Sequence, residues 1–167
     1  MVEVALRDSL QPALLDRLTD QHPERKTEGR DERVISRAQL RASVLRDLSW
    51  LFNTTNLSAE LDLTRHPLVA RSTVNYGLTP LSGRPVSNLD LTALERLLKE
   101  AILAFEPRIL APSLTVTALP VGDALTHHNI LSFEIAGELW GQPYPLELLI
   151  RTEMDLESGE VRLAEGR

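Results

Sequence analysis

The sequence predicts an α+β fold, in which two main helices are followed by an antiparallel three- to four-stranded meander that packs on them, preceded by a tethered N-terminal arm. In residues 36–52 and 91–105, apolar side chains recur every three or four positions, as in helices with one buried face. In residues 130–140 and 146–156 they alternate with polar side chains instead, which is the spacing of half-buried strands.

The N-terminal residues 1–33 are expected to form an amphipathic arm and a charged linker, and residues 34–167 the α+β domain. Residues 9–20 carry leucines at the spacing of a short helix or turn, which either folds back on the domain or docks on a partner. Residues 21–33 contain eight charged side chains out of thirteen, too many for burial, which predicts a solvated linker.

The first main helix is expected to run from Ser36 to Phe52. Ser36 and Gln39 have the spacing of a capping box, and the polar run 53–56 ends the helix because short polar side chains compete for the backbone. Residues 57–89 hold several prolines and glycines, which predicts a long irregular segment. Long loops in compact domains are often functional, so we expect an interaction surface there.

The second main helix is expected to begin at a capping box formed by Thr92 and Glu95, with Asp90 as an alternative cap, and to end near Phe105. A weaker strand is predicted at residues 114–119, and residues 141–145 are expected to join the two long strands as a hairpin loop. The turn signal Ser158-Gly159 predicts a short fourth strand after it.

The segment Glu106-Pro107-Arg108 stands where the second helix ends. Proline lacks an N–H and disfavours helical geometry in the residue before it, so Glu106 is expected to be extended. Side chains two apart in an extended segment point the same way. Glu106 and Arg108 can therefore pair with each other as a plain surface ion pair, or each can be offered to a group elsewhere.

Composition excludes several kinds of site. The net charge of −6 argues against nonspecific nucleic-acid binding, and the lack of cysteine excludes disulfides and thiolate metal sites. The only adjacent histidines, His127 and His128, would point to opposite faces of a strand, so neither a metal nor a cofactor is expected. There is no secretory signal and no apolar stretch of about 18 residues, which favours a cytoplasmic protein.

An enzyme is not expected. A glycosidase needs two carboxylates across a sugar, and although Glu106 can be combined with Glu134 or Glu138, no spacing selects a pair. Motifs of serine hydrolases and of phosphate-binding loops are absent. Trp50 and Trp140 are expected in the core or at its edge rather than as ligand platforms.

Three blocks, at residues 43–54, 66–84 and 105–109, resemble the type VI secretion baseplate subunit family TssE, which is similar to a contractile-phage baseplate wedge protein. The resemblance covers residues 36–157 and includes the leucine arm at 14–18. It implies a structural role in a baseplate docked at the inner membrane through other subunits. The family's former label "lysozyme-like" leaves a peptidoglycan-cleaving hydrolase as an alternative, beside a generic adaptor domain.

The resemblance also implies partners. The family sits in the wedge with TssF, TssG and TssK and contacts the first ring of the sheath formed by TssB and TssC. An exposed sheet edge would help to initiate sheath polymerisation by strand addition. Glu106, Pro107 and Arg108 match a family motif implicated in assembly and are the expected partner-binding residues. Accordingly, Glu106→Ala is expected to weaken assembly and to leave the isolated fold largely intact.

Overall fold

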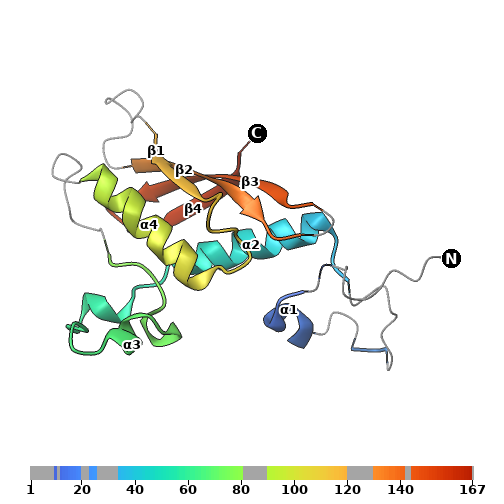
Figure 1. Ribbon diagram of the computed structural model, residues 1–167, viewed down its shortest axis with the longest axis horizontal. Helices are drawn as coiled ribbons and strands as arrows, with labels where there is room; N and C mark the ends of the chain where they lie inside the picture. Colours follow the sequence, from blue (N-terminus) through green and yellow to red (C-terminus); the bar gives the residue numbers. More distant parts are fainter. Residues whose placement is uncertain are drawn as a thin grey trace.

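The computed structural model describes residues 10, 12–19, 23–25, 34–80, 90–119, 130–141 and 144–166. Its sheet has four antiparallel strands in the order β1 (Thr115–Ala118), β2 (Ile130–Leu139), β3 (Leu146–Asp155) and β4 (Val161–Glu165). Helices α2 (Arg37–Phe52) and α4 (Leu91–Phe105) cover one face of the sheet (Figure 1). The predicted α+β fold with a four-stranded meander is confirmed.

Helix α2 begins at the predicted capping box. The Ser36 hydroxyl accepts from the Gln39 N–H at 3.2 Å, and the Gln39 side chain accepts from the Ser36 N–H at 2.8 Å. Two of the otherwise unpaired donors at the helix start are satisfied in this way. The helix ends at Asn53, whose N–H still donates to the Ser49 carbonyl oxygen.

Helix α4 begins at Asp90, the alternative cap, and not at a capping box of Thr92 and Glu95. The Asp90 carboxylate accepts from the Ala93 N–H at 3.1 Å. The Glu95 carboxylate instead accepts from the N–H of Ala118 in β1 at 2.7 Å. Glu95 thus ties α4 to the sheet, a tertiary contact that local spacing does not reveal.

Asp90→Ala is expected to lower the free energy of unfolding by about 0.5–2 kcal/mol, because it removes the acceptor at the start of α4. Thr92→Ala, in the first turn of the same helix, is expected to stay within about 0.5 kcal/mol of wild type. Urea unfolding of both variants tests the assignment. A larger loss for Thr92→Ala would restore Thr92 as the cap.

The core lies between the two helices and the inner face of the sheet. Every second residue of β3 is buried, and in β2 the same alternation holds except at Gly137, with Phe133 and Ile150 fully enclosed. Thr152 was not predicted among them, yet it is buried, and its hydroxyl lies 3.4 Å from the Phe133 carbonyl oxygen. The helices contribute most of the stripe predicted for them: Leu40, Val44, Leu48, Leu51, Leu94, Leu98 and Ile102. Leu91, also predicted in the stripe of the second helix, is 38% exposed, and Phe105 is only partly buried.

The segment after α2 is more regular than predicted. It contains the short helices η3 (Leu57–Ala59), α3 (Pro67–Ala70) and η4 (Thr73–Asn75), while residues 81–89 lie outside the described part. Gly77 closes the segment with a φ of +117°, and a Cβ there would lie 2.2 Å from the Thr54 carbonyl oxygen. Only glycine fits that conformation and that approach.

Of the two places expected for the tryptophans, the core and its edge, the core is ruled out for both. Trp50 is 48% exposed and Trp140 is 52% exposed. The Arg46 guanidinium lies 5.0 Å from the centre of the Trp50 ring, at the distance of a cation–π contact. Helix periodicity does not separate a tryptophan at the flank of the buried stripe from one inside it.

The arm contributes helix α1 (Leu14–Leu18), and all three of its leucines are exposed. Residues 1–9 and 26–33 lie outside the described part, as do His127, His128 and residues 142–143 of the hairpin loop, so predictions for them stay untested. No helix in the described part is long and apolar enough to cross a membrane.

Candidate partner-binding site

Glu106 caps the C-terminal end of α4 and is only 4% exposed. It was expected to be extended, but with φ −121° and ψ 78° its backbone is neither helical nor extended, and the chain turns here, with the Ile109 N–H donating to the Glu106 oxygen at 3.2 Å. Its carboxylate accepts from the Arg108 backbone N–H at 3.1 Å and from the Arg108 Nε at 2.6 Å, and it also pairs with Arg108 Nη2. The pairing of Glu106 with Arg108 is therefore present, but it is buried rather than a surface ion pair.

Arg108 also joins this corner to α2. Its Nη1 donates to the Ser43 hydroxyl at 3.0 Å, and its Nη2 donates to the Asp47 carboxylate at 2.5 Å. Its backbone oxygen accepts from the Trp140 N–H at 2.7 Å, at the end of β2. One arginine thus connects the end of α4 to α2 through charge-assisted hydrogen bonds of its guanidinium, and to the sheet through its backbone oxygen.

Alternating charges continue from Asp47 to the arm. Arg46 Nε donates to the Asp47 carboxylate at 2.9 Å, and Arg46 Nη1 donates to Asp16 of α1 at 2.5 Å. The backbone adds a second tie, from the Ile35 N–H to the Leu10 oxygen at 3.0 Å. The described part of the arm therefore folds back on the domain, which is one of the two predicted alternatives.

The surroundings of Arg108 and Tyr76 shift the pKa of both groups upward. Burial alone would lower the pKa of Arg108, but the bonds and charges of Glu106 and then of Asp47 outweigh it and raise that pKa. Burial, followed by the charges of Asp47 and Glu106, raises the pKa of Tyr76. The Tyr76 hydroxyl stays protonated and donates to the Asp47 backbone oxygen at 3.2 Å.

Asp16→Ala is expected to loosen α1 without unfolding the domain. The pair with Arg46 is partly exposed, and such pairs contribute about 0–1 kcal/mol. Amide exchange of residues 14–18 should become faster while the melting temperature stays nearly unchanged. Arg17→Ala, which removes a charge from the same helix, serves as the control. Equal exchange in both variants would show that Asp16 does not hold the arm.

The three blocks that carried the resemblance meet at this network. Asp47 comes from the first block, Tyr76 from the second, and Glu106 and Arg108 from the third. Sequence reasoning missed Ser43 and Asp47 as partners of Arg108. The sequence did contain a sign of this contact: Ser43 and Asp47 are four residues apart, so in a helix their side chains lie next to each other on the same face.

The burial of Glu106 changes what its removal is expected to do. The expectation that Glu106→Ala leaves the fold intact assumed a carboxylate available at the surface. In the structure this carboxylate holds Arg108, so the variant also breaks an internal contact. Any effect on a partner must therefore be measured together with stability.

The carboxylates considered for glycoside hydrolysis are not brought together. Glu134 lies on the outer face of the sheet, 3.6 Å from Arg151, and Glu138 is exposed on the same face. Glu106 lies on the other side, beside Asp47 and Ser43 of α2. Glu106 therefore does not share a face of the sheet with either strand residue.

The two outer strands differ in how their free backbone groups are covered. Next to β1, the Leu119 N–H donates to the Ser132 oxygen of β2. The backbone N–H of the preceding Ala118 therefore points away from β2, where the Glu95 carboxylate accepts from it. In β4, the Gly166 N–H bonds to Leu149 of β3. The alternation of a strand therefore turns the backbone groups of Val161, Leu163 and Glu165 outward.

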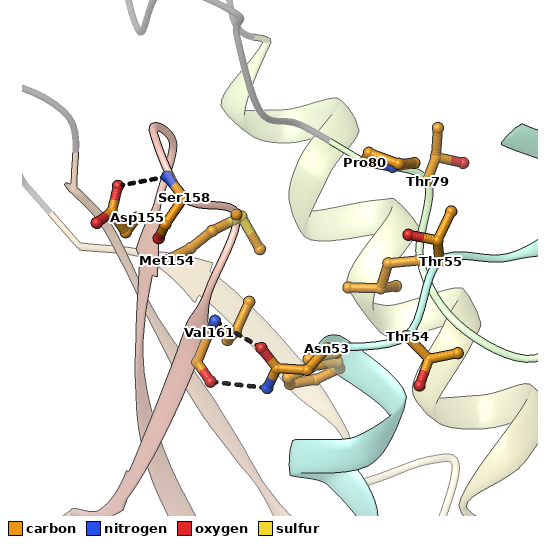
Figure 2. A pocket seen from close by; sticks show the side chains of 12 residues that line it. Asn53, Thr54, Thr55, Thr79, Pro80, Met154, Asp155, Ser158 and Val161 are labelled. Atoms are coloured by element: carbon orange, nitrogen blue, oxygen red, sulfur yellow. Dashed lines mark hydrogen bonds between the residues drawn. The ribbon is translucent and has the colours of Figure 1, made fainter.

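Asn53 covers the first of these outward positions. Its amide oxygen accepts from the Val161 N–H at 2.9 Å, and its amide nitrogen donates to the Val161 oxygen at 2.8 Å (Figure 2). A cavity of about 210 Å³ lies next to this contact, lined by Thr54, Thr55, Met154 and Ser158 among others. No described residue bonds to the outward groups of Leu163 and Glu165.

Comparison with known proteins gives one match. Residues 38–144, more than half of the chain, match the family described as baseplate wedge protein gp25. Neither the curated proteins nor the solved structures contain a match to the chain. The matched range includes α2, α4, β2 and the whole network around Arg108 apart from Asp16. The chain therefore belongs to the baseplate wedge protein gp25 family, to which the type VI secretion subunit TssE also belongs.

Proposed function

We propose that this protein is the TssE-type baseplate subunit of a type VI secretion machine, where it joins wedge subunits to the first sheath ring and helps to initiate sheath polymerisation. Family membership supports a structural role in the baseplate of a contractile injection system. The observation that carries the proposal is the convergence of three separate blocks on Arg108. Its proposed partners are TssF, TssG and TssK in the wedge, and TssB and TssC in the sheath.

The proposed contact surface lies around Pro107 and Arg108. Pro107 is exposed, and Arg108 keeps 22% of its side chain accessible after its internal bonds are made. The buried Glu106 carboxylate holds the Arg108 guanidinium in one orientation through two hydrogen bonds. A guanidinium fixed in this way loses little conformational freedom on binding, which favours a partner with a carboxylate or a row of backbone oxygens.

The test is co-purification of the tagged full chain with the wedge and sheath subunits encoded with it. Pro107→Ala is the informative variant because its side chain is exposed, and Arg96→Ala is the control on the exposed face of α4. The proposal expects capture by wild type and Arg96→Ala, and reduced capture by Pro107→Ala with an unchanged circular dichroism spectrum. Failure of the wild-type chain to capture any of these subunits would contradict the proposed function.

A further inference from the structure

Helix α1 turns an apolar face toward the solvent. Leu14 and Leu18 are 71% and 73% exposed, and Leu15 is 48% exposed. At about 3.6 residues per turn, these three side chains lie within an arc of roughly 100° and form one surface, the leucine face. No residue of α1 is buried. Single exposed leucines are ordinary, but neighbouring ones on one face of a helix are typical of a contact with another protein.

Asp16 determines which way the leucine face points. On the helix it lies roughly opposite the leucines. Its carboxylate accepts from Arg46 Nη1 of α2 at 2.5 Å, so the polar side of α1 is bound to the domain and the leucines are directed away from it. An arm that folded back only to bury itself would be expected to do the reverse, because burying a leucine stabilises more than a partly exposed ion pair does.

The leucine face is too small to hold a partner alone. Even a fully buried aromatic side chain removes only about 150–250 Å² of surface from water. Three leucines therefore remain well below the roughly 800 Å² that each partner buries in a stable interface. The same limit applies to a second copy of this chain that paired through α1. The leucine face needs a further contact on the same partner.

The nearest candidate for that further contact is the Arg108 corner, formed by Pro107 and Arg108. Arg46 Nε and Arg108 Nη2 donate to the two oxygens of one carboxylate, that of Asp47, at 2.9 and 2.5 Å. Only this pair of arginines stands between α1 and the Arg108 corner, and α1 lies beside α2 (Figure 1). A partner that contacts the Arg108 corner therefore has the leucine face within reach.

We propose that the leucine face is the second half of the partner-binding surface, and that it enters an apolar groove on the same wedge subunit that contacts the Arg108 corner. The inference rests on the proposed function and adds a second contact and its chemistry. Arg17 is exposed beside the leucines, and no described residue pairs with its guanidinium, so a carboxylate at the rim of the groove is favoured. Once one half is bound, the other binds intramolecularly, which raises the overall affinity.

The test measures the dissociation constant of the purified wedge subunits on the immobilised full chain. The informative variant replaces both Leu14 and Leu18 by glutamine, which has a similar helix propensity and so preserves α1. The matched control replaces Leu68 and Val74, which are 86% and 66% exposed elsewhere on the domain. Asp16→Asn keeps the leucines and removes the charge that orients them. Circular dichroism, thermal melting and light scattering are recorded for each variant.

We expect the leucine variant to bind at least about tenfold more weakly than wild type, because two apolar contacts are lost. The control variant is expected to bind like wild type. Asp16→Asn is expected to lie between the two, since its leucines are present but must be ordered on binding. All variants should melt like wild type, because none of the replaced side chains is buried.

Three outcomes would overturn the inference. Wild-type affinity in the leucine variant would show that the partner does not use α1. Equal weakening in the control variant would show a general effect of exposed apolar side chains. Dimerisation of wild type that disappears in the leucine variant would show that a second copy covers the leucine face. Each of these leaves the proposed function standing if wild type binds wedge subunits, whereas a wild-type chain that binds none of them rejects both.

Discussion

We expect Arg108→Met to lower the free energy of unfolding by about 3–5 kcal/mol, because it leaves the buried Glu106 carboxylate without its cationic partner. Glu106 is 4% exposed, and its carboxylate receives three hydrogen bonds from Arg108. The substitution removes the two made by the guanidinium. It also removes the bonds from α4's end to Ser43 and Asp47 of α2. Methionine keeps the length of the side chain, so the loss reports on the charge. Urea unfolding followed by circular dichroism measures it.

Two further variants make this result specific. Arg96→Ala removes an arginine whose pair with Glu100 is exposed on both sides, and it should change stability by less than about 0.5 kcal/mol. Adding Glu106→Gln to Arg108→Met neutralises the stranded carboxylate and should restore part of the loss. If Arg108→Met behaved like Arg96→Ala, the network around Arg108 would not hold the domain together.

Most of the fold could be predicted because it follows from local patterns. The alternation in β2 and β3 marks their buried faces, and Ser36 with Gln39 marks the start of α2. Glycine at position 77 and proline at position 107 mark places where the chain must turn. Each of these signals depends on residues within a few positions of one another, so no knowledge of the tertiary structure is needed.

Most of the features that the sequence did not predict depend instead on residues far apart in the chain. Glu95 has the spacing of a helix cap, yet a strand more than twenty residues away takes its carboxylate. Ser43 and Asp47 look like a solvated helix flank until Arg108 reaches them from another element. Trp50 is 48% exposed and its ring lies against Arg46, a contact that helix periodicity does not reveal. Each of these depends on which elements pack together, and one sequence does not specify that.

The candidate site shows both cases at once. Sequence alone located Glu106, Pro107 and Arg108 at the end of a helix and predicted that the two charges could pair. It did not predict that the pair is buried, and burial makes Glu106 a support for Arg108. A motif of this kind can matter to assembly and to folding at the same time. Variants that separate the two must therefore come from its exposed members.

The sheet edge offers a sharper separation of folding from assembly. Leu163→Pro removes an N–H that faces away from β3, so no hydrogen bond of the ladder is lost. Leu163→Ala controls for the loss of the leucine side chain. Ala164→Pro, one residue further, removes an N–H that faces β3, and we expect it to destabilise the protein by about 3 kcal/mol or more.

Leu163→Pro is therefore expected to melt close to Leu163→Ala and yet to lose sheath recruitment, while it still captures the wedge subunits. The reason is that proline has no N–H to offer an incoming strand and its ring obstructs close approach. Co-purification with the sheath subunits and thermal melting, measured on all three variants, give the result. Sheath recruitment by Leu163→Pro at the wild-type level would show that no strand pairs with β4, and the sheath contact would then have to be made by side chains around Pro107 and Arg108.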